Sequence, residues 1–191
     1  MKNKYYCVNI AKNLKKYLFM RMIRLLGRKD MITGNILIFS GDGHGKSPAA
    51  LGKAIEAACN GKKVVMIQFL KEKTLDENAF IKRLEPEIKF FRFEKSEDNF
   101  NLLSEERQKE EVMNIKNGMN FAKKVLCTGE CNLLILDEVL GLLDNGIISI
   151  EELKSVLQAK SDDTAIIMTG ITVNDEICNL ADEVSKIETI R

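Results

Sequence analysis

Apolar and polar residues alternate along this chain in blocks, and the blocks predict buried strands separated by amphipathic helices. Continuous apolar runs of strand length are found at 35–39, 63–70, 132–136 and 164–169, with weaker candidates at 88–93 and 184–190. Apolar residues three and four positions apart predict helices over 51–58, 75–84 and 175–180, a long helix from Ser104 and another after Ser149. Unbroken apolar strands between helices are typical of a mostly parallel sheet with helices on both faces. We therefore predict one α/β domain over residues 31–191.

Residues 1–30 differ from the rest of the chain in charge. They hold nine Lys or Arg and one acid, a net charge of +8, whereas residues 31–191 hold 20 basic and 27 acidic side chains. Apolar residues at roughly helical spacing between Ile10 and Leu25 predict an amphipathic helix in this basic arm. We expect the arm to dock on the protein itself rather than on nucleic acid, because a nucleic-acid-binding protein is usually basic overall. The alternative is that translation begins at Met31 and that the arm is an upstream artefact.

The composition narrows the class of protein. Of the 191 residues, 45% are hydrophobic and 30% are charged, which is typical of a globular protein with a packed core. The apolar runs are far shorter than the ~20 residues that a membrane-spanning helix needs, so no membrane span is expected. Five cysteines without regular spacing favour a cytoplasmic protein over a secreted disulfide scaffold. The only histidine, His44, excludes metal sites built from several histidines, and the acidic run 105–111 is interpreted as a solvated helix face.

A glycine-rich stretch follows the first predicted strand and precedes the first predicted helix. The phosphate-binding pattern G-x-x-x-x-G-K-[ST] is met except at its first position, which is Ser40. Three alternating glycines let the backbone curl and turn N–H groups inward, and the helix N-terminus adds a positive dipole end. The residues expected to bind the nucleotide phosphates are Gly41, Asp42, Gly43, His44, Gly45, Lys46 and Ser47. We expect the Lys46 ammonium to face solvent until it contacts phosphate and assists catalysis, and the Ser47 hydroxyl to reach Mg²⁺.

The apolar strand 132–136 leads directly into two acids. Asp137 is predicted at the carboxyl end of the sheet beside the phosphate loop, where it can hold Mg²⁺ together with Ser47. Glu138 is the second catalytic candidate beside Lys46, because it can orient a metal-bound water or the substrate. A strand end capped by two solvated acids is the alternative, and the nearby phosphate loop disfavours it.

The stretch 40–52 and the following stretch 61–71 resemble the ATP:corrinoid adenosyltransferases of cobalamin biosynthesis and salvage. Further segments similar to that family are 133–138, 166–170 and 180–184, so that the resemblance covers about residues 35–190. It implies a RecA-like P-loop fold, a homodimer, and ATP and a reduced corrinoid as substrates. It also implies the reaction, in which the 5′-deoxyadenosyl group of ATP moves to the corrinoid cobalt and triphosphate is released.

Three positions depart from the family pattern. His44 and Pro48 interrupt its common G-K-G-K-T-T run, and Ile171 stands where an arginine is expected near the nucleotide. These departures leave two alternatives open. One is another P-loop enzyme, such as a small-molecule kinase or an ATPase. The other is a nucleotide- or corrinoid-binding homologue without catalysis.

Aromatic residues that press on the corrin are a further implication of the resemblance. Phe100 lies in the polar stretch 95–101, where a large apolar residue has little structural reason to be. We therefore predict that Phe100 contacts the corrinoid. Phe90, Phe91 and Phe93 are expected in the strand core instead.

Overall fold

The computed structural model describes residues 34–70, 82–96 and 100–190, and the structural statements below refer to these residues. The basic arm 1–30 and most of the predicted helix 75–84 lie outside the described residues, so both remain predictions.

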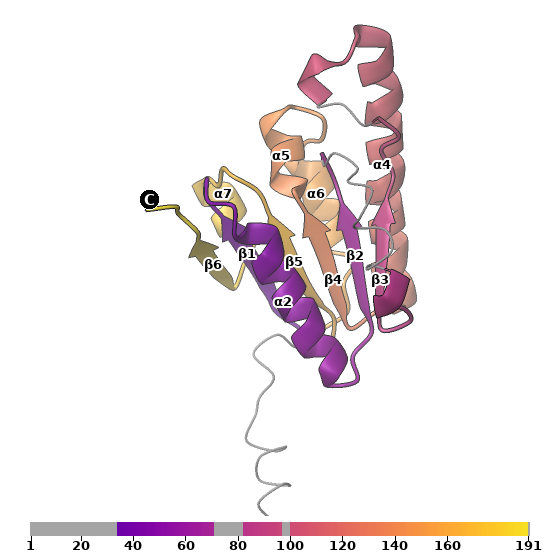
Figure 1. Cartoon of the computed structure of the whole chain (residues 1–191), viewed down its shortest axis with the longest axis vertical. Coiled ribbons are helices and arrows are strands. Elements are labelled where there is room, and N and C mark those ends of the chain that lie inside the picture. The colour runs from indigo at the N-terminus through magenta and orange to yellow at the C-terminus, as the bar shows by residue number, and fades with distance from the viewer. Residues whose placement is uncertain (1–33, 71–81, 97–99, 191) are drawn as a thin grey trace, which may run out of the picture. The chain divides into compact units, whose positions relative to one another are not determined.

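Six strands form one sheet in the order β3-β2-β4-β5-β1-β6 (Figure 1). The strands are β1 (Ile36–Ser40), β2 (Val64–Gln68), β3 (Ile88–Arg92), β4 (Leu133–Asp137), β5 (Ala165–Thr169) and β6 (Glu183–Lys186). Each neighbouring pair is parallel, so the carboxyl ends of the strands meet at one edge of the sheet. The predicted parallel α/β sheet is confirmed.

Helices cover both faces of this sheet (Figure 1). The α-helices are α2 (Lys46–Cys59), α4 (Glu105–Thr128), α5 (Val139–Asp144), α6 (Ile150–Leu157) and α7 (Asp175–Cys178). Two short 3₁₀ helices, η1 (Lys82–Leu84) and η2 (Phe100–Leu102), flank β3 in the chain. The sequence pattern missed α5, because its residues are almost all apolar and show no helical alternation of apolar and polar positions.

Alternate residues of each central strand enter two separate cores. On one face, residues such as Met66 and Ile135 pack against the small side chains Ala50, Ala54 and Ala57 of α2. On the other face, the intervening strand residues pack against α4, α5, α6 and α7. Burial on both faces explains why the central strands are continuous apolar runs rather than alternating ones.

Several local predictions hold in the structure. Ser149 and Glu152 form a capping box at the start of α6, with each side chain accepting a hydrogen bond from the backbone of the other residue. Phe91 belongs to the strand core, with its ring 4.6 Å from that of Phe121, and Phe93 packs on the same ring at 5.5 Å. In the described part of the chain, no helix has the length and apolar character that crossing a membrane requires.

Candidate active site

The phosphate loop runs from the end of β1 to the start of α2, and the chain after β6 packs against it. The Ile187 N–H donates to the Ser40 carbonyl at 2.7 Å, and the Gly43 N–H donates to the Ile187 carbonyl at 3.1 Å. Gly41 has φ +112°, and a Cβ at this position would collide with the Ile187 carbonyl. A Cβ on Gly43 would lie 2.9 Å from the same oxygen. The close approach of Ile187 therefore requires glycine at both positions.

This packing changes which N–H groups are available to an anion. The Gly41 N–H donates to the Ile171 carbonyl at 3.1 Å, and the Gly43 N–H is held by Ile187. The expectation that these two N–H groups point into a phosphate nest is therefore wrong. The first N–H groups of a helix have no partner within the helix, and in α2 these belong to Gly45, Lys46 and Ser47. The positive end of α2 thus offers N–H donors to an anion.

Lys46 is buried, with 8% of its surface exposed. Its Nζ donates to the carbonyl oxygens of Gly41 at 2.7 Å and of Gly43 at 3.0 Å. The prediction of a solvent-facing ammonium was wrong, because the curl of the loop turns two carbonyls toward Nζ. Lys46 therefore braces the loop as well as placing a positive charge in it. Asp42 and His44 are exposed at the loop surface.

The structure brings the loop and the Asp137 carboxylate together, as the sequence predicted. Asp137 is fully buried, and its Oδ1 accepts hydrogen bonds from the Ser47 hydroxyl at 2.8 Å and the Thr169 hydroxyl at 2.7 Å. Its Oδ2 faces the side-chain amide of Gln68, with Nε2 at 3.3 Å. Sequence reasoning missed Thr169 and Gln68, although each is a polar residue that ends a buried apolar strand. Asp137 was predicted from the same kind of position, a polar residue at the end of a buried apolar strand.

Glu138 follows Asp137 in a left-handed conformation with φ +63°. Its backbone N–H donates to the Thr169 hydroxyl at 2.7 Å, so this one hydroxyl contacts both acids of the strand end. A left-handed residue other than glycine costs about 1–3 kcal/mol, and such residues cluster at functional sites. The conformation turns the chain from β4 into α5. The catalytic role of Glu138 remains a prediction.

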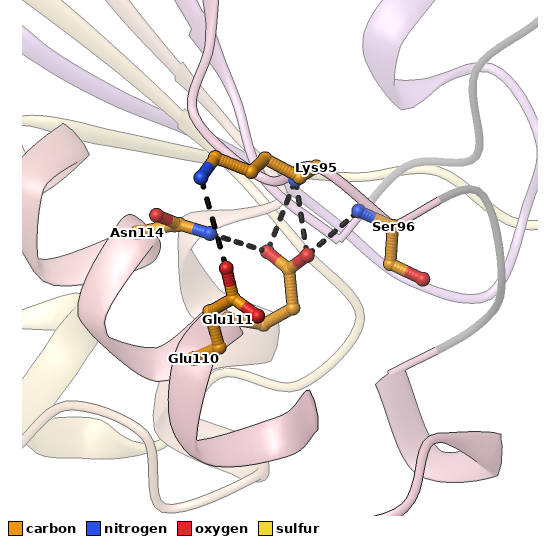
Figure 2. Close-up of polar contacts among 5 residues, drawn as sticks. All are labelled: Lys95, Ser96, Glu110, Glu111 and Asn114. Carbon is orange, nitrogen blue, oxygen red and sulfur yellow. Dashed lines mark hydrogen bonds and ion pairs between the residues drawn. The ribbon is translucent and has the colours of Figure 1, made fainter. Parts of the chain in front are cut away.

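A second group of polar contacts lies where β3 ends (Figure 2). The Glu111 carboxylate of α4 accepts the backbone N–H groups of Lys95 at 3.0 Å and Ser96 at 2.6 Å, and the Asn114 side chain at 3.2 Å. Glu111 is 5% exposed, so the interpretation of 105–111 as a solvated face is wrong at this residue. The carboxylate anchors the chain that leaves β3. Lys95 also pairs with the exposed Glu110 at 3.7 Å.

Glu94 joins the ends of β2 and β3. Its Oε1 accepts the backbone N–H of Leu70 at 2.9 Å, and Leu70 itself is left-handed with φ +52°. Its buried Oε2 has no hydrogen-bond partner among the described residues. Burial raises the pKa of the Glu94 carboxyl above its usual range, and the nearby Glu111 charge adds to this effect. No sequence pattern singled out Glu94, because its partners come from other elements.

Phe100 lies in η2, where it is half-buried and packs against the core on the α4 side of the sheet. Its carbonyl accepts a hydrogen bond from the Gln108 side chain at 3.2 Å. Phe100 therefore has a structural role that the polar surrounding sequence did not reveal. Its contact with a corrinoid remains a prediction.

The residues around Asp137 fit a magnesium ion. No cluster of three His, Cys, Asp or Glu side chains that could hold a metal is present in the ranges that the structure describes. Mg²⁺ does not need such a cluster, because it is usually bound by one or two protein oxygens together with substrate phosphates. The Ser47 hydroxyl and the Asp137 carboxylate lie 2.8 Å apart and are both oxygen ligands. Their assignment as metal ligands remains a prediction.

The loop between β1 and α2, hydrogen-bonded to an acid that ends another strand of the parallel sheet, defines a P-loop nucleotide-binding protein. Two solved structures share this fold at 16% sequence identity. The flagellar accessory protein FlaH from Methanocaldococcus jannaschii matches 81% of this chain and 71% of its own, with a TM-score of 0.53. A KaiC-like protein from Pyrococcus horikoshii OT3 matches 83% of this chain and 75% of its own, with a TM-score of 0.54. The predicted RecA-like P-loop fold is confirmed.

Sequence comparison then defines the family. Residues 32–191 match the family of the ATP:corrinoid adenosyltransferase BtuR/CobO/CobP, and the chain belongs to this family. The Corrinoid adenosyltransferase of Escherichia coli (strain K12) is 28% identical over 158 residues, which are 83% of this chain and 78% of the relative. That of Pseudomonas aeruginosa is 25% identical over 159 residues, 83% of this chain and 76% of the relative. The resemblance seen in the sequence motifs is confirmed.

A third relative is longer than this chain. An uncharacterized protein of a Nostoc species is 28% identical over 173 residues, which are 85% of this chain but 46% of the relative. The chain thus spans about half the length of that protein.

Proposed function

We propose that this chain transfers the 5′-deoxyadenosyl group of ATP to the cobalt of a reduced corrinoid and releases triphosphate, in cobalamin biosynthesis or salvage. The family match over residues 32–191 is the observation that carries the proposal. The hydrogen bond between Ser47 and Asp137 supports it, because it joins the phosphate loop to the acid that ends β4.

In this reaction the protein must position the substrates and stabilise charge, and it does not need to act as an acid or a base. The cobalt(I) of the reduced substrate is itself the nucleophile, so a cobalt–carbon bond forms at C5′ as the bond from C5′ to the triphosphate oxygen breaks. The protein must hold C5′ in line with cobalt and stabilise the charge of the leaving triphosphate. The ammonium of Lys46 and the N–H groups at the start of α2 suit the second task.

Ser47 and Asp137 are the residues proposed to hold Mg²⁺. When bound, Mg²⁺ would neutralise part of the triphosphate charge. Glu138, held by its backbone hydrogen bond to Thr169, is proposed to orient the substrate or a metal-bound water. Phe100 is proposed to contact the corrinoid.

The remaining parts of the proposal concern assembly. The protein is proposed to be a cytoplasmic homodimer, in which the basic arm 1–30 covers the active site of the neighbouring subunit. Opposite charges support this, since the arm is +8 and residues 31–191 hold seven more acidic than basic side chains. A protein that begins at Met31 should show a higher KM for the corrinoid if the arm is a lid. It should behave as the full chain does if the arm is an artefact.

A product assay tests the central reaction. The purified full chain is incubated with ATP, Mg²⁺ and chemically reduced cobalamin, and the adenosylated corrinoid and the phosphate products are separated and quantified. We expect triphosphate and adenosylcobalamin in equal amounts, and neither product without the corrinoid. ADP formed without a corrinoid would instead indicate an ATPase or a kinase. Binding of ATP or of a corrinoid without turnover would indicate a non-catalytic homologue.

A further inference from the structure

Polar side chains form a row across the carboxyl ends of four adjacent strands. Arg92 ends β3, Gln68 ends β2, Asp137 ends β4 and Thr169 ends β5. Gln68 lies in register with Arg92 on one side and with Asp137 on the other. The strand residues two positions earlier all pack in the core on the α2 side of the sheet. Because side chains alternate along a strand, the whole row lies on the α2 side, which is the side of the phosphate loop.

Two hydrogen bonds link Arg92 to Asp137 through Gln68. The Arg92 Nη2 donates to the Gln68 Oε1 at 3.0 Å, and the Gln68 Nε2 donates to the Asp137 Oδ2 at 3.3 Å. A guanidinium has donors only, so the oxygen of the Gln68 amide must face Arg92. The amide nitrogen then faces Asp137, whose ionised carboxylate only accepts. Arg92 and Asp137 thereby favour the same orientation of the Gln68 amide, and Arg92 holds it from the side away from the carboxylate.

We propose that Gln68 and Arg92 are positioning residues for the magnesium ligand Asp137, an inference that rests on the metal site of the proposed function. The Ser47 and Thr169 hydroxyls both bond to Oδ1, and Gln68 holds Oδ2. If Arg92 is lost, the Gln68 Oε1 loses the donor that fixes it, and the amide is then held less firmly against Oδ2. Partners of this kind that orient a metal ligand are worth roughly 10–100-fold in metal affinity.

A purely structural role makes a different prediction. Gln68 is 9% exposed and Arg92 is half-buried, so their hydrogen bonds also satisfy buried polar groups. If that were their whole contribution, removing either side chain would lower stability and leave the metal dependence of nucleotide binding unchanged.

The test measures ATP affinity of the full chain by isothermal titration calorimetry, once with Mg²⁺ and once with EDTA. The readout is the ratio of the two dissociation constants, which needs no turnover. We expect Arg92→Met to reduce the gain in affinity that Mg²⁺ provides by roughly 10–100-fold and to leave the affinity in EDTA unchanged. Arg92→Lys, which still offers a donor to Gln68, should retain most of the gain.

Two further variants control the experiment. Lys89→Met removes the same charge from the same strand, but Lys89 is exposed and pairs in register with Val65, on the opposite face, so the ratio should not change. Gln68→Met keeps the length of the side chain and removes both hydrogen bonds, so it should reproduce Arg92→Met even if that variant folds poorly. Circular dichroism melting checks the fold of each variant.

The outcomes separate this inference from the proposed function. Arg92→Met and Gln68→Met proteins that keep the full Mg²⁺ gain would overturn the positioning role and leave the metal site standing. If the wild-type chain binds ATP equally well with Mg²⁺ and with EDTA, both the metal site and the positioning role are overturned. The adenosyl-transfer assay reports on the reaction independently of either result.

Discussion

The phosphate loop and the carboxyl ends of β2 and β3 lie at the same edge of the sheet, but they are built in different ways. The loop is continuous in sequence and works through backbone groups, with Lys46 and Ile187 holding its curl. The strand ends work through side chains that meet from separate parts of the chain, such as Arg92 with Gln68, and the Glu94 carboxylate with the Leu70 N–H. The glycines and the lysine of the loop are neighbours in the sequence, and their partners from elsewhere are backbone carbonyls such as that of Ile187, whereas the strand ends depend on the register of the sheet. Variants in the two regions should therefore fail in different ways.

The largest effect is expected from the loop lysine. Lys46→Ala removes the side-chain charge that we assign to the triphosphate, and the loss of one such donor lowers turnover by about 10²–10³-fold. The Gly41 and Gly43 carbonyls also lose their donor, so a modest decrease in melting temperature should accompany the loss of activity. Steady-state adenosyl-transfer kinetics and thermal denaturation measure the two effects. Wild-type activity in this variant would overturn the assignment of the loop.

The glycines of the loop test whether its shape depends on Ile187. Gly41→Ala places a Cβ against the Ile187 carbonyl at φ +112°, and such strain should lower the free energy of unfolding by about 1–3 kcal/mol. Gly52→Ala is the matched control, because a Cβ there meets no atom within 4 Å. Since Gly52 lies inside α2, that change should stabilise the protein by roughly 0.5–1 kcal/mol. Equal urea midpoints for the two variants would contradict the close packing of Ile187.

Asp137 connects the two regions, so its neutral variant shows how far they act together. Asp137→Asn keeps the shape of the side chain and loses the charge that pairs with Mg²⁺. The Mg²⁺ concentration that gives half-maximal activity should therefore rise by at least about tenfold. ATP affinity in EDTA should change less than this. The measurement is a Mg²⁺ titration of activity beside calorimetry without metal. If the titration is unchanged, the metal role moves to Glu138.

The smallest effect concerns Glu94 and depends on pH. The folded protein raises the pKa of this carboxyl above 4.5, so it binds the proton more tightly than the unfolded chain does. The free energy of unfolding should therefore fall as the pH rises from 4.5 through the raised pKa, and Glu94→Gln should remove that part of the decrease. Urea denaturation at several pH values measures it, with the exposed Glu106→Gln as the control. A wild-type pH profile in Glu94→Gln would show that the buried carboxyl does not govern this dependence.

Much of the architecture was predictable because strands and loops leave local patterns. The six predicted strands are all present, each within a few residues of its expected bounds. The central ones are buried on both faces, and this burial is what makes an unbroken apolar run. The phosphate loop and Asp137 were predictable for a related reason, since a glycine-rich turn before a helix and an acid after a buried strand are readable within a few residues.

The polar partners at the edge of the sheet were not predictable in this way. Ser47 and Asp137 are 90 positions apart, and Gln68 meets Arg92 only because β2 lies between β3 and β4. Periodicity marks each strand but carries no information on which strand is its neighbour. The burial of Lys46 and Glu111 likewise depends on carbonyl and N–H groups that only the folded backbone brings together. The local sequence thus specified the elements and the loop chemistry, while the order of the strands selected the partners of Asp137, Gln68 and Arg92, because hydrogen bonds between side chains form between neighbours in space.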